Sequence, residues 1–582
     1  MNSELRASSG GKDREKILSP YRMALLGVAL TSGILNVLML TGSFYMLEIY
    51  DRVVPSRSLP TLIGLTILVT VLFAFQGFLD LIRTRVLIHI GAAIDQKLSD
   101  SVFRGILKMP LMKTNGGEGL LALRDLDQIR GFFGGTGLPA FFDLPWVPLY
   151  LGICYVFHPL IGLAATAAGV FLFGLTLLTE FSGRSATRDM TRHGTQRFAI
   201  AESARRNAEV VRSMGMSDSL AATWRTTNEQ YVAAQLRTTN IASGFGTLAR
   251  SFRMLLQSIV LGLGAFLVIN DQSSGGIIIA GSILTARALA PIDLAISNWK
   301  IFVAARQAWQ RLSELIATTR EPPAPLQLPP PRRDIVIEGL AVSPPGETRI
   351  VARNIAFSLK AGAALGVVGP TASGKSSLLK AIVGVWPALR GTIRIDGATL
   401  DQFPSSLLGP HVGYLPQDVE LFSDTVARNI ARFEDKPDPK KVIAAAEAAS
   451  AHELIKHLPR GYETPIGQAG LALSAGQRQR IALARALYGN PFLVVLDEPN
   501  SNLDAEGEQA LTQAILGVRV RGGIVIVAAH RLGALDGVDW LLIMKGGAMH
   551  SFGTKNEVLE LNRQSNVSPT VVTPINAGGS AR

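Results

Sequence analysis

The sequence has little cysteine and little charge. Its 582 residues include one cysteine, Cys154, which lies within an apolar run. A disulfide framework and a cysteine-based metal site are therefore excluded, and Cys154 is interpreted as a small buried hydrophobic residue. Charged residues make up only 18% of the chain. With a mean hydropathy of +0.27, this composition is apolar for a water-soluble protein.

Acidic residues are also fewer than basic ones. The chain has 45 Asp and Glu against 57 Lys and Arg, a net charge of +12. Such a balance is typical of nucleic-acid-binding proteins, and also of membrane proteins with basic cytoplasmic loops. The arginines gather in residues 83–130 and 184–237, between apolar runs. Because no basic patch is interleaved with base-stacking aromatic residues, we expect a membrane protein and no nucleic-acid partner.

Apolar runs in the first half predict six membrane spans, since a helix crosses a bilayer with about 20 residues. The runs are 23–47, 58–79, 144–179, 255–270 and 276–297, and His158-Pro159 divides the third into two spans. The first twenty residues lack the pattern of a secretory signal peptide. The long Arg-rich segments and the N-terminus are expected in the cytoplasm. As helices, these segments would project far beyond the bilayer.

A proline-rich stretch marks a domain boundary. Residues 321–333 contain six prolines, which cannot form a helix and act as a semi-rigid spacer. After it, short β-branched runs alternate with helical patterns, which predicts an α/β domain. We expect an N-terminal cytoplasmic segment at 1–20, an all-α six-helix membrane domain at 21–317, a linker at 318–334, an α/β P-loop NTPase domain at 335–560 and a disordered tail at 561–582.

A phosphate-binding loop follows the apolar strand predicted at residues 364–368. The stretch from Gly369 to Ser376 fits G-x-x-x-x-G-K-[ST] between a strand and a helix, which is the context that the motif requires. Backbone N–H groups of such a loop surround the phosphates. Lys375 is expected to reach the β- and γ-phosphates, and Ser376 to bind Mg²⁺. The candidate ATP-binding residues are Gly369, Pro370, Thr371, Ala372, Ser373, Gly374, Lys375, Ser376 and Ser377.

Two carboxylates end another apolar strand at residues 493–498. Asp497 is predicted to hold Mg²⁺, and Glu498 to polarise the attacking water. Unpaired acids at the end of a buried strand are costly unless cations lie nearby, which favours this interpretation over a strand that simply leaves the core.

The sequence LSAGQ at 473–477, together with Gln417 in YLPQD, SNLD at 501–504 and His530, resembles the ABC ATPase family over residues 335–559. The resemblance implies that two such domains bind ATP and Mg²⁺ between them. The phosphate loop of one copy then faces Ser474, Ala475, Gly476 and Gln477 of the other. It also implies that Gln417 contacts Mg²⁺ and water, that His530 contacts the γ-phosphate, and that Asp504 lies in the D-loop at the dimer interface.

One departure concerns the nucleotide base. ABC ATPases usually stack adenine on an aromatic residue before the phosphate loop, where this sequence has Pro344. The next aromatic residue, Phe357, is expected in a strand core. We therefore expect weaker base contact and poor discrimination between ATP and GTP.

The membrane half resembles type I protein-secretion ATPases, through residues 46–62, 141–150 and 213–218. Within that family it is most similar to the PrtD-like exporters of proteases, lipases and repeat toxins. The resemblance implies a homodimer in the inner membrane that exports a polypeptide with an uncleaved C-terminal signal. It also implies a periplasmic membrane-fusion adaptor and a TolC-like outer-membrane channel.

Arg287 is a charge midway along the sixth predicted span. A charge at that depth is costly unless it faces a cavity or a partner, so Arg287 is a candidate for the translocation path, with Glu48 as a possible partner. A structural role is equally consistent with the sequence. One alternative function stays open, a homodimeric exporter of lipids or small molecules. Six spans with asymmetric charge argue against a soluble ABC ATPase acting on DNA, and Lys375 and Glu498 argue against a scaffold that binds ATP without turnover.

Overall fold

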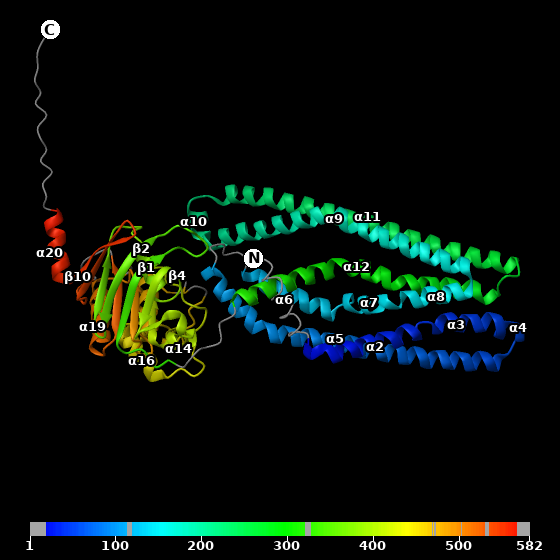
Figure 1. Cartoon of the computed structure of the whole chain (residues 1–582), viewed down its shortest axis with the longest axis horizontal. Coiled ribbons are helices and arrows are strands. Elements are labelled where there is room, and N and C mark those ends of the chain that lie inside the picture. Colours follow the sequence, from blue (N-terminus) through cyan, green and yellow to red (C-terminus); the bar gives the residue numbers. More distant parts are fainter. Residues whose placement is uncertain are drawn as a thin grey trace, which may run out of the picture. The chain divides into compact units, whose positions relative to one another are not determined.

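The computed structural model describes residues 19–112, 119–319, 328–467, 470, 473–501, 503–529 and 535–566. The chain divides into two compact units, residues 1–109 with 115–320, and residues 321–582 with the segment 110–114. Each unit is described by itself (Figure 1).

The first unit consists of helices, and six of its helical segments are long and apolar enough to cross a membrane. Its elements are η1 (Ser19–Tyr21), α2 (Arg22–Leu38), α3 (Thr41–Glu48), the π-helix η2 (Ile49–Val53), α4 (Val54–Ser56), α5 (Leu59–Met112), α6 (Gly119–Gly134), α7 (Gly137–Asp143), η3 (Leu144–Trp146), α8 (Val147–Phe157), α9 (Pro159–Arg206), α10 (Ala208–Ser213), α11 (Ser217–Ile269) and α12 (Gly275–Thr319). The expectation of six spans is therefore confirmed.

Four of these helices are much longer than a membrane crossing needs. Helices α5, α9, α11 and α12 contain 54, 48, 53 and 45 residues. At 1.5 Å per residue, α11 is about 80 Å long. Along their length α9 and α11 pack against each other, with Phe171 and Phe252 in ring contact at 4.2 Å and the Arg197 guanidinium 4.1 Å from the Tyr231 ring centre. Where they are described, the Arg-rich segments are thus largely helical, as expected.

The first span differs from the expected single helix. It breaks at Met39, where α2 ends, and a π-helix interrupts it again at Ile49–Val53. The expected turn at 51–57 is also mostly helical, and only Arg57 takes a left-handed conformation, with φ 50°. By contrast, the break at His158 lies where the sequence predicts it, because Pro159 begins α9 and its predecessor is extended.

A buried polar network joins three spans of this unit. Arg83 of α5 lies 3.0 Å from Asp143 of α7, and both side chains are less than a tenth exposed. Asn36 of α2 donates to the same carboxylate at 2.9 Å, and Ser32 Oγ accepts from Arg83 at 3.1 Å. The Tyr150 hydroxyl donates to the Asn36 side-chain oxygen at 3.0 Å. Each charge is therefore paired, as a low-dielectric environment requires.

At the opposite end of the spans, Asp51 caps the last helix. Its Oδ1 accepts from the backbone N–H of Gly276 at 2.8 Å, and its Oδ2 accepts from the Ser274 hydroxyl at 2.5 Å. A carboxylate at a helix N-terminus satisfies free N–H groups and is favoured by the helix dipole. The first and sixth spans are thus connected at this end.

The second unit is built around one ten-stranded sheet with the order β5-β4-β1-β2-β10-β9-β3-β8-β7-β6. Its strands are β1 (Asp334–Val342), β2 (Ala352–Lys360), β3 (Ala364–Val368), β4 (Ala388–Ile395), β5 (Ala398–Thr399), β6 (Val412–Leu415), β7 (Leu493–Asp497), β8 (Ile524–Ala529), β9 (Trp540–Lys545) and β10 (Ala548–Thr554). The helices and short turns are α13 (Lys375–Ile382), η4 (Leu400–Gln402), α14 (Ser405–Leu408), η5 (Gly409–His411), α15 (Val426–Ile430), α16 (Pro439–Ala448), α17 (His452–Lys456), η6 (Gly461–Glu463), α18 (Ala475–Leu487), α19 (Ala505–Val520) and α20 (Lys555–Asn566).

Two boundaries differ from those expected. Helix α12 continues to Thr319, beyond the expected start of the linker at residue 318. Helix α20 reaches Asn566, so the expectation of a disordered tail from residue 561 is wrong for its first six residues. Residues 1–18, residues 320–327 of the linker and the tail from 567 onward lie outside the described residues. At the linker's end, the Asp396 carboxylate accepts from the N–H groups of Arg332, Arg333 and Asp334 at 2.7 to 3.0 Å.

Candidate functional site

The carboxyl ends of four parallel strands meet at one edge of the sheet. Strands β3 and β7 both pair in parallel with β8, through Val368 with Ala529 and Asp497 with Ala528. On the far side of β7, Leu415 of β6 pairs with Leu496. The phosphate-binding loop, the two acids and the segment of Gln417 therefore all leave the sheet at the same edge, where ligands of open α/β sheets bind.

The loop after β3 requires its glycines. A Cβ on Gly369 would lie 2.3 Å from the Met544 carbonyl oxygen, and one on Gly374 would lie 2.5 Å from that of Val351. Gly374 also has φ 93°, which a residue with a side chain rarely adopts. Pro370, Thr371 and Ala372 form an exposed tip. This geometry leaves the loop backbone free to approach a phosphate group.

Lys375 begins α13 and is 4% exposed. Its Nζ donates to the backbone oxygens of Gly369 at 2.9 Å and Pro370 at 3.1 Å, so the ammonium lies within the loop. Burial lowers the pKa of Lys375, while the charges of Glu498 and Asp497 act in the opposite direction. The side chain thus places a positive charge where a bound phosphate group would lie.

Ser376 and Asp497 together offer the kind of oxygen atoms that a cation site would use. The Ser376 hydroxyl donates to Asp497 Oδ1 at 3.0 Å, while Asp497 Oδ2 is buried and has no hydrogen-bond partner among the described residues. Burial raises the pKa of Asp497, and the hydrogen bond from Ser376 opposes this change. A buried oxygen without a partner beside a hydroxyl group fits Mg²⁺, which takes one or two protein oxygens and completes its shell with phosphates and water.

Glu498 follows Asp497 with φ 50°, a left-handed conformation that is uncommon outside glycine. Its backbone N–H bonds to the Ala528 oxygen at 3.0 Å, which holds the turn against β8. Its Oε2 accepts from Gln417 Nε2 at 3.1 Å. The structure therefore joins two residues that are 81 positions apart in the sequence, and both were predicted to act on the attacking water.

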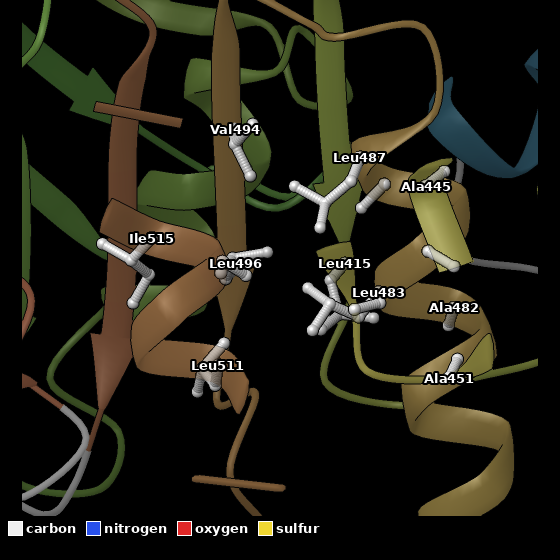
Figure 2. Close-up of a cluster of buried hydrophobic side chains, with 14 of the residues drawn as sticks. Leu415, Ala445, Ala451, Ala482, Leu483, Leu487, Val494, Leu496, Leu511 and Ile515 are labelled. Atoms are coloured by element: carbon white, nitrogen blue, oxygen red, sulfur yellow. The ribbon is translucent and has the colours of Figure 1, made fainter. Parts of the chain in front are cut away.

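The LSAGQ segment forms the first turn of α18. Ser474 is the N-cap: its hydroxyl accepts from the Gln477 N–H at 3.3 Å, and Gln477 Oε1 accepts from the Ser474 N–H at 2.9 Å. Ser474 and Ala475 are exposed, and Gly476 is partly exposed. Figure 2 shows that Leu483 and Leu487 of α18 point toward β6 and β7, within a core cluster of this unit. The N-terminal end of α18, away from these leucines, thus presents backbone N–H groups at the surface.

Two contacts around α18 were not predicted. Gln479 is 3% exposed and donates to the Pro499 oxygen, just after Glu498. Asp504 caps α19 through the Gly507 N–H at 2.8 Å and also accepts from Arg480 at 2.8 Å. Asp504 thus connects α18 to α19 within one chain. The sequence signal for the Gln479 contact was a polar residue at a position of α18 that the helical pattern places in the core.

Several predicted residues are not brought into this arrangement. His530 lies outside the described residues. In the other unit, Arg287 and Glu48 are both exposed. Glu48 lies 3.9 Å from Arg52, and within the part of the chain that is described Arg287 makes no ion pair. The structure does not join Arg287 to Glu48.

The region expected to contact the base has no aromatic residue available. Phe357 is 5% exposed and stacks on Phe552 at 5.7 Å, so it belongs to the strand core, as expected. The Val351 carbonyl lies against Gly374, which places its neighbour Ile350, 48% exposed, beside the phosphate-binding loop. Pro344 is half-buried in the preceding turn.

Because no aromatic side chain among the described residues is placed to stack on the nucleotide base, we predict that the site selects weakly between adenine and guanine. The kcat/KM for GTP should lie within about tenfold of that for ATP, because an apolar contact without hydrogen bonds discriminates little. Pro344→Tyr should lower the KM for ATP severalfold, since base stacking stabilises by about 1–3 kcal/mol. Steady-state hydrolysis with each nucleotide measures both, and a strong ATP preference of the unaltered protein would contradict the prediction.

Comparison with known families matches both units. Residues 25–290 match the ABC transporter transmembrane region, and residues 352–501 match the ABC transporter family of the ATPase domain. A solved structure of a bacterial Atm1-family ABC exporter with ATP bound shares the fold, with a TM-score of 0.79 at 21% identity over 94% of this chain and 99% of that one.

Relatives over nearly the full length are more specific. The type I secretion system ATP-binding protein PrsD of Rhizobium meliloti (strain 1021) is 54% identical over 95% of both chains. The toxin RTX-I translocation ATP-binding protein of Actinobacillus pleuropneumoniae is 28% identical, over 93% of this chain and 77% of its own. With the phosphate-binding loop, the paired acids and six membrane-spanning helices described above, the chain belongs to the ABC transporters, among the type I secretion system ATP-binding proteins.

Proposed function

We propose that this chain is the ATPase of a type I secretion system, and that it exports a polypeptide with an uncleaved C-terminal signal. The observation that carries the proposal is the 54% identity to a type I secretion protein across both the membrane unit and the ATPase unit. The toxin-translocating relatives support a polypeptide substrate of the protease, lipase or repeat-toxin type.

The chain spans the inner membrane with its N-terminus and ATPase unit in the cytoplasm. Support comes from the arginines of α9 and α11, since short cytoplasmic segments near spans carry excess positive charge. The ends near Asp51, His158 and Asp271 carry few basic residues and lie in the periplasm.

The functional molecule is a homodimer. Ser474 and Gly476 begin a helix whose N-terminal N–H groups lie at the surface, which favours a contact with the γ-phosphate held by a second copy. Asp504 lies near the same interface. ATP thus connects the two copies, and hydrolysis releases them.

In each site, Lys375 and the N–H groups from Gly369 to Ser377 bind the phosphates. Ser376 and Asp497 hold Mg²⁺, with Gln417 near the ion; when bound, Mg²⁺ neutralises charge on the phosphate oxygens. Glu498, oriented by Gln417, accepts a proton from the attacking water. His530 contacts the γ-phosphate.

The system is completed by a periplasmic membrane-fusion adaptor and a TolC-like outer-membrane channel. The test is a comparison of proteins in the culture medium from cells with the intact chain, without it, and with Glu498→Gln. We expect a polypeptide that is present in the medium of cells with the intact chain and absent from the medium of the other two. Removal of its C-terminal segment should keep this polypeptide inside the cells. An unchanged secreted set, with ATPase activity stimulated by lipids or small molecules, would contradict the proposal.

Arg287 is proposed to face the exported polypeptide. It is exposed on α12, between buried Thr285 and Ala288, so only one face of the helix carries charge there. Arg287→Ala should reduce substrate-stimulated ATPase activity more than basal activity, and Arg287→Lys, which keeps the charge, should restore part of it. Equal loss of both activities in parallel with expression would indicate a structural role instead.

A further inference from the structure

One face of α9 changes from apolar to basic along its length. Phe173, Leu177 and Phe181 are 60%, 43% and 70% exposed. At spacings of three and four residues they are followed on the same face by Arg184, Arg188 and Arg192, which are all exposed. A helix surface that is exposed to lipid tails therefore continues directly into a row of guanidinium groups.

These arginines outnumber the two acidic residues near them on α9, Glu180 and Asp189, which lie four residues before Arg184 and three residues before Arg192. Among the described residues none forms an ion pair with Arg184, Arg188 or Arg192, although Glu180 and Asp189 lie on the same helix. Helix α11, which packs along α9, has no Asp or Glu between Glu229 and Asp271. The local charge at this level is therefore positive.

Distance places the first two arginines within reach of lipid headgroups. Helix α9 begins at Pro159, so a 30 Å hydrocarbon core ends about 20 residues later, near Thr179. Arg184 then lies about 7 Å beyond that boundary, and Arg188 about 13 Å. Because Cα–Cβ bonds tilt toward the helix N-terminus, which is the membrane end of α9, both side chains extend back toward the bilayer.

We propose that Arg184 and Arg188 bind the phosphate groups of anionic lipids, and that Arg192 adds long-range attraction to the same leaflet. Guanidinium groups recognise phosphate oxygens with two parallel hydrogen bonds. Each basic residue near an anionic surface strengthens binding by roughly fivefold. This surface is distinct from the nucleotide site and from Arg287.

The test uses the full chain in nanodiscs of phosphatidylcholine with increasing phosphatidylglycerol. Native mass spectrometry counts the phosphatidylglycerol molecules that stay bound after transfer to detergent. Arg184→Gln/Arg188→Gln should lower the affinity for phosphatidylglycerol by at least about tenfold. The matched control, Arg205→Gln/Arg206→Gln, removes the same charge from the far end of α9, where both arginines pair with Glu202. This control should change the affinity for phosphatidylglycerol by less than about twofold.

A measurement on the unaltered protein covers the case in which the double variant does not fold. Its retention of phosphatidylglycerol should exceed that of phosphatidylcholine and fall steeply between 50 and 500 mM salt, since the contacts are electrostatic. Equal retention of both lipids would overturn the proposal. So would equal losses in the two double variants, or a loss of the dimer in Arg184→Gln/Arg188→Gln alone, which would assign this face to a second copy of the chain.

Discussion

Glu498→Gln should lower ATP turnover by about 10²- to 10³-fold while leaving ATP binding intact, because a general base contributes a factor of this size. The glutamine has the same shape, and its side-chain oxygen still accepts the hydrogen bond from Gln417 Nε2 that the carboxylate accepts at 3.1 Å. The geometry is therefore kept and only the proton acceptor is lost. Steady-state phosphate release, with nucleotide binding measured separately, checks both parts.

If the proposed dimer is correct, the same variant should stay dimeric with ATP and Mg²⁺ bound, since the γ-phosphate proposed to connect the two copies is not removed. Size-exclusion chromatography with and without ATP resolves the two states. Glu506→Gln is the control. This carboxylate on α19 is exposed, its ion pair with Arg480 is long at 3.8 Å, and it is not among the residues assigned to the nucleotide site. Turnover near that of the unaltered protein in Glu498→Gln would refute the role assigned to Glu498.

Asp143→Leu should destabilise the membrane unit by about 3–5 kcal/mol, because it removes the buried carboxylate of the Arg83 guanidinium and leaves only the exposed Asp80 as an ionic partner. Arg83 is 7% exposed, and its Nη1 lies 3.0 Å from Asp143 Oδ1. Asn36 would also lose one of the two acceptors of its Nδ2 group and keep the other, the Ser32 backbone oxygen. Thermal unfolding of the purified protein in detergent measures the loss.

The double substitution Arg83→Leu/Asp143→Leu separates pairing from packing. With both charges removed, most of the stability should return, since a well-packed apolar pair replaces a buried ion pair at little cost. Asp80→Ala is the matched control: Asp80 also bonds Arg83, at 2.7 Å, but its side chain is 54% exposed, so its loss should change stability by less than about 1 kcal/mol. A double variant as unstable as Asp143→Leu would show that the charges themselves are required.

The nucleotide site could be predicted from the sequence because its residues follow strands. The loop that leads to Lys375 follows one short apolar run, and Asp497 ends another; parallel strands bring such carboxyl ends to one edge. Glycines at 369 and 374 likewise mark positions where a side chain would collide with the backbone of distant residues. The order of the motifs therefore carried most of the three-dimensional information.

The membrane unit was predictable only in outline. Its apolar runs gave the spans, and His158-Pro159 gave one break. The interruption at Met39, however, has neither proline nor an adjoining charge to signal it, and a π-helix has no sequence pattern. The pairing of Arg83 with Asp143 depends on how two helices pack, and 60 residues separate the two positions. Sequence reasoning considered Arg287 and Glu48 as partners instead, and the structure does not join them.

The cap that Asp51 forms on α12 sets an energetic threshold for movement at this end of the spans. To part the first span from the sixth there, the molecule must break two hydrogen bonds to a carboxylate and expose a helix N-terminus. Charge-assisted bonds of this kind contribute about 1.5–3 kcal/mol each. Thermal motion would therefore separate these two helix ends only rarely, and any movement that parts the first span from the sixth at this end must supply the free energy of both bonds.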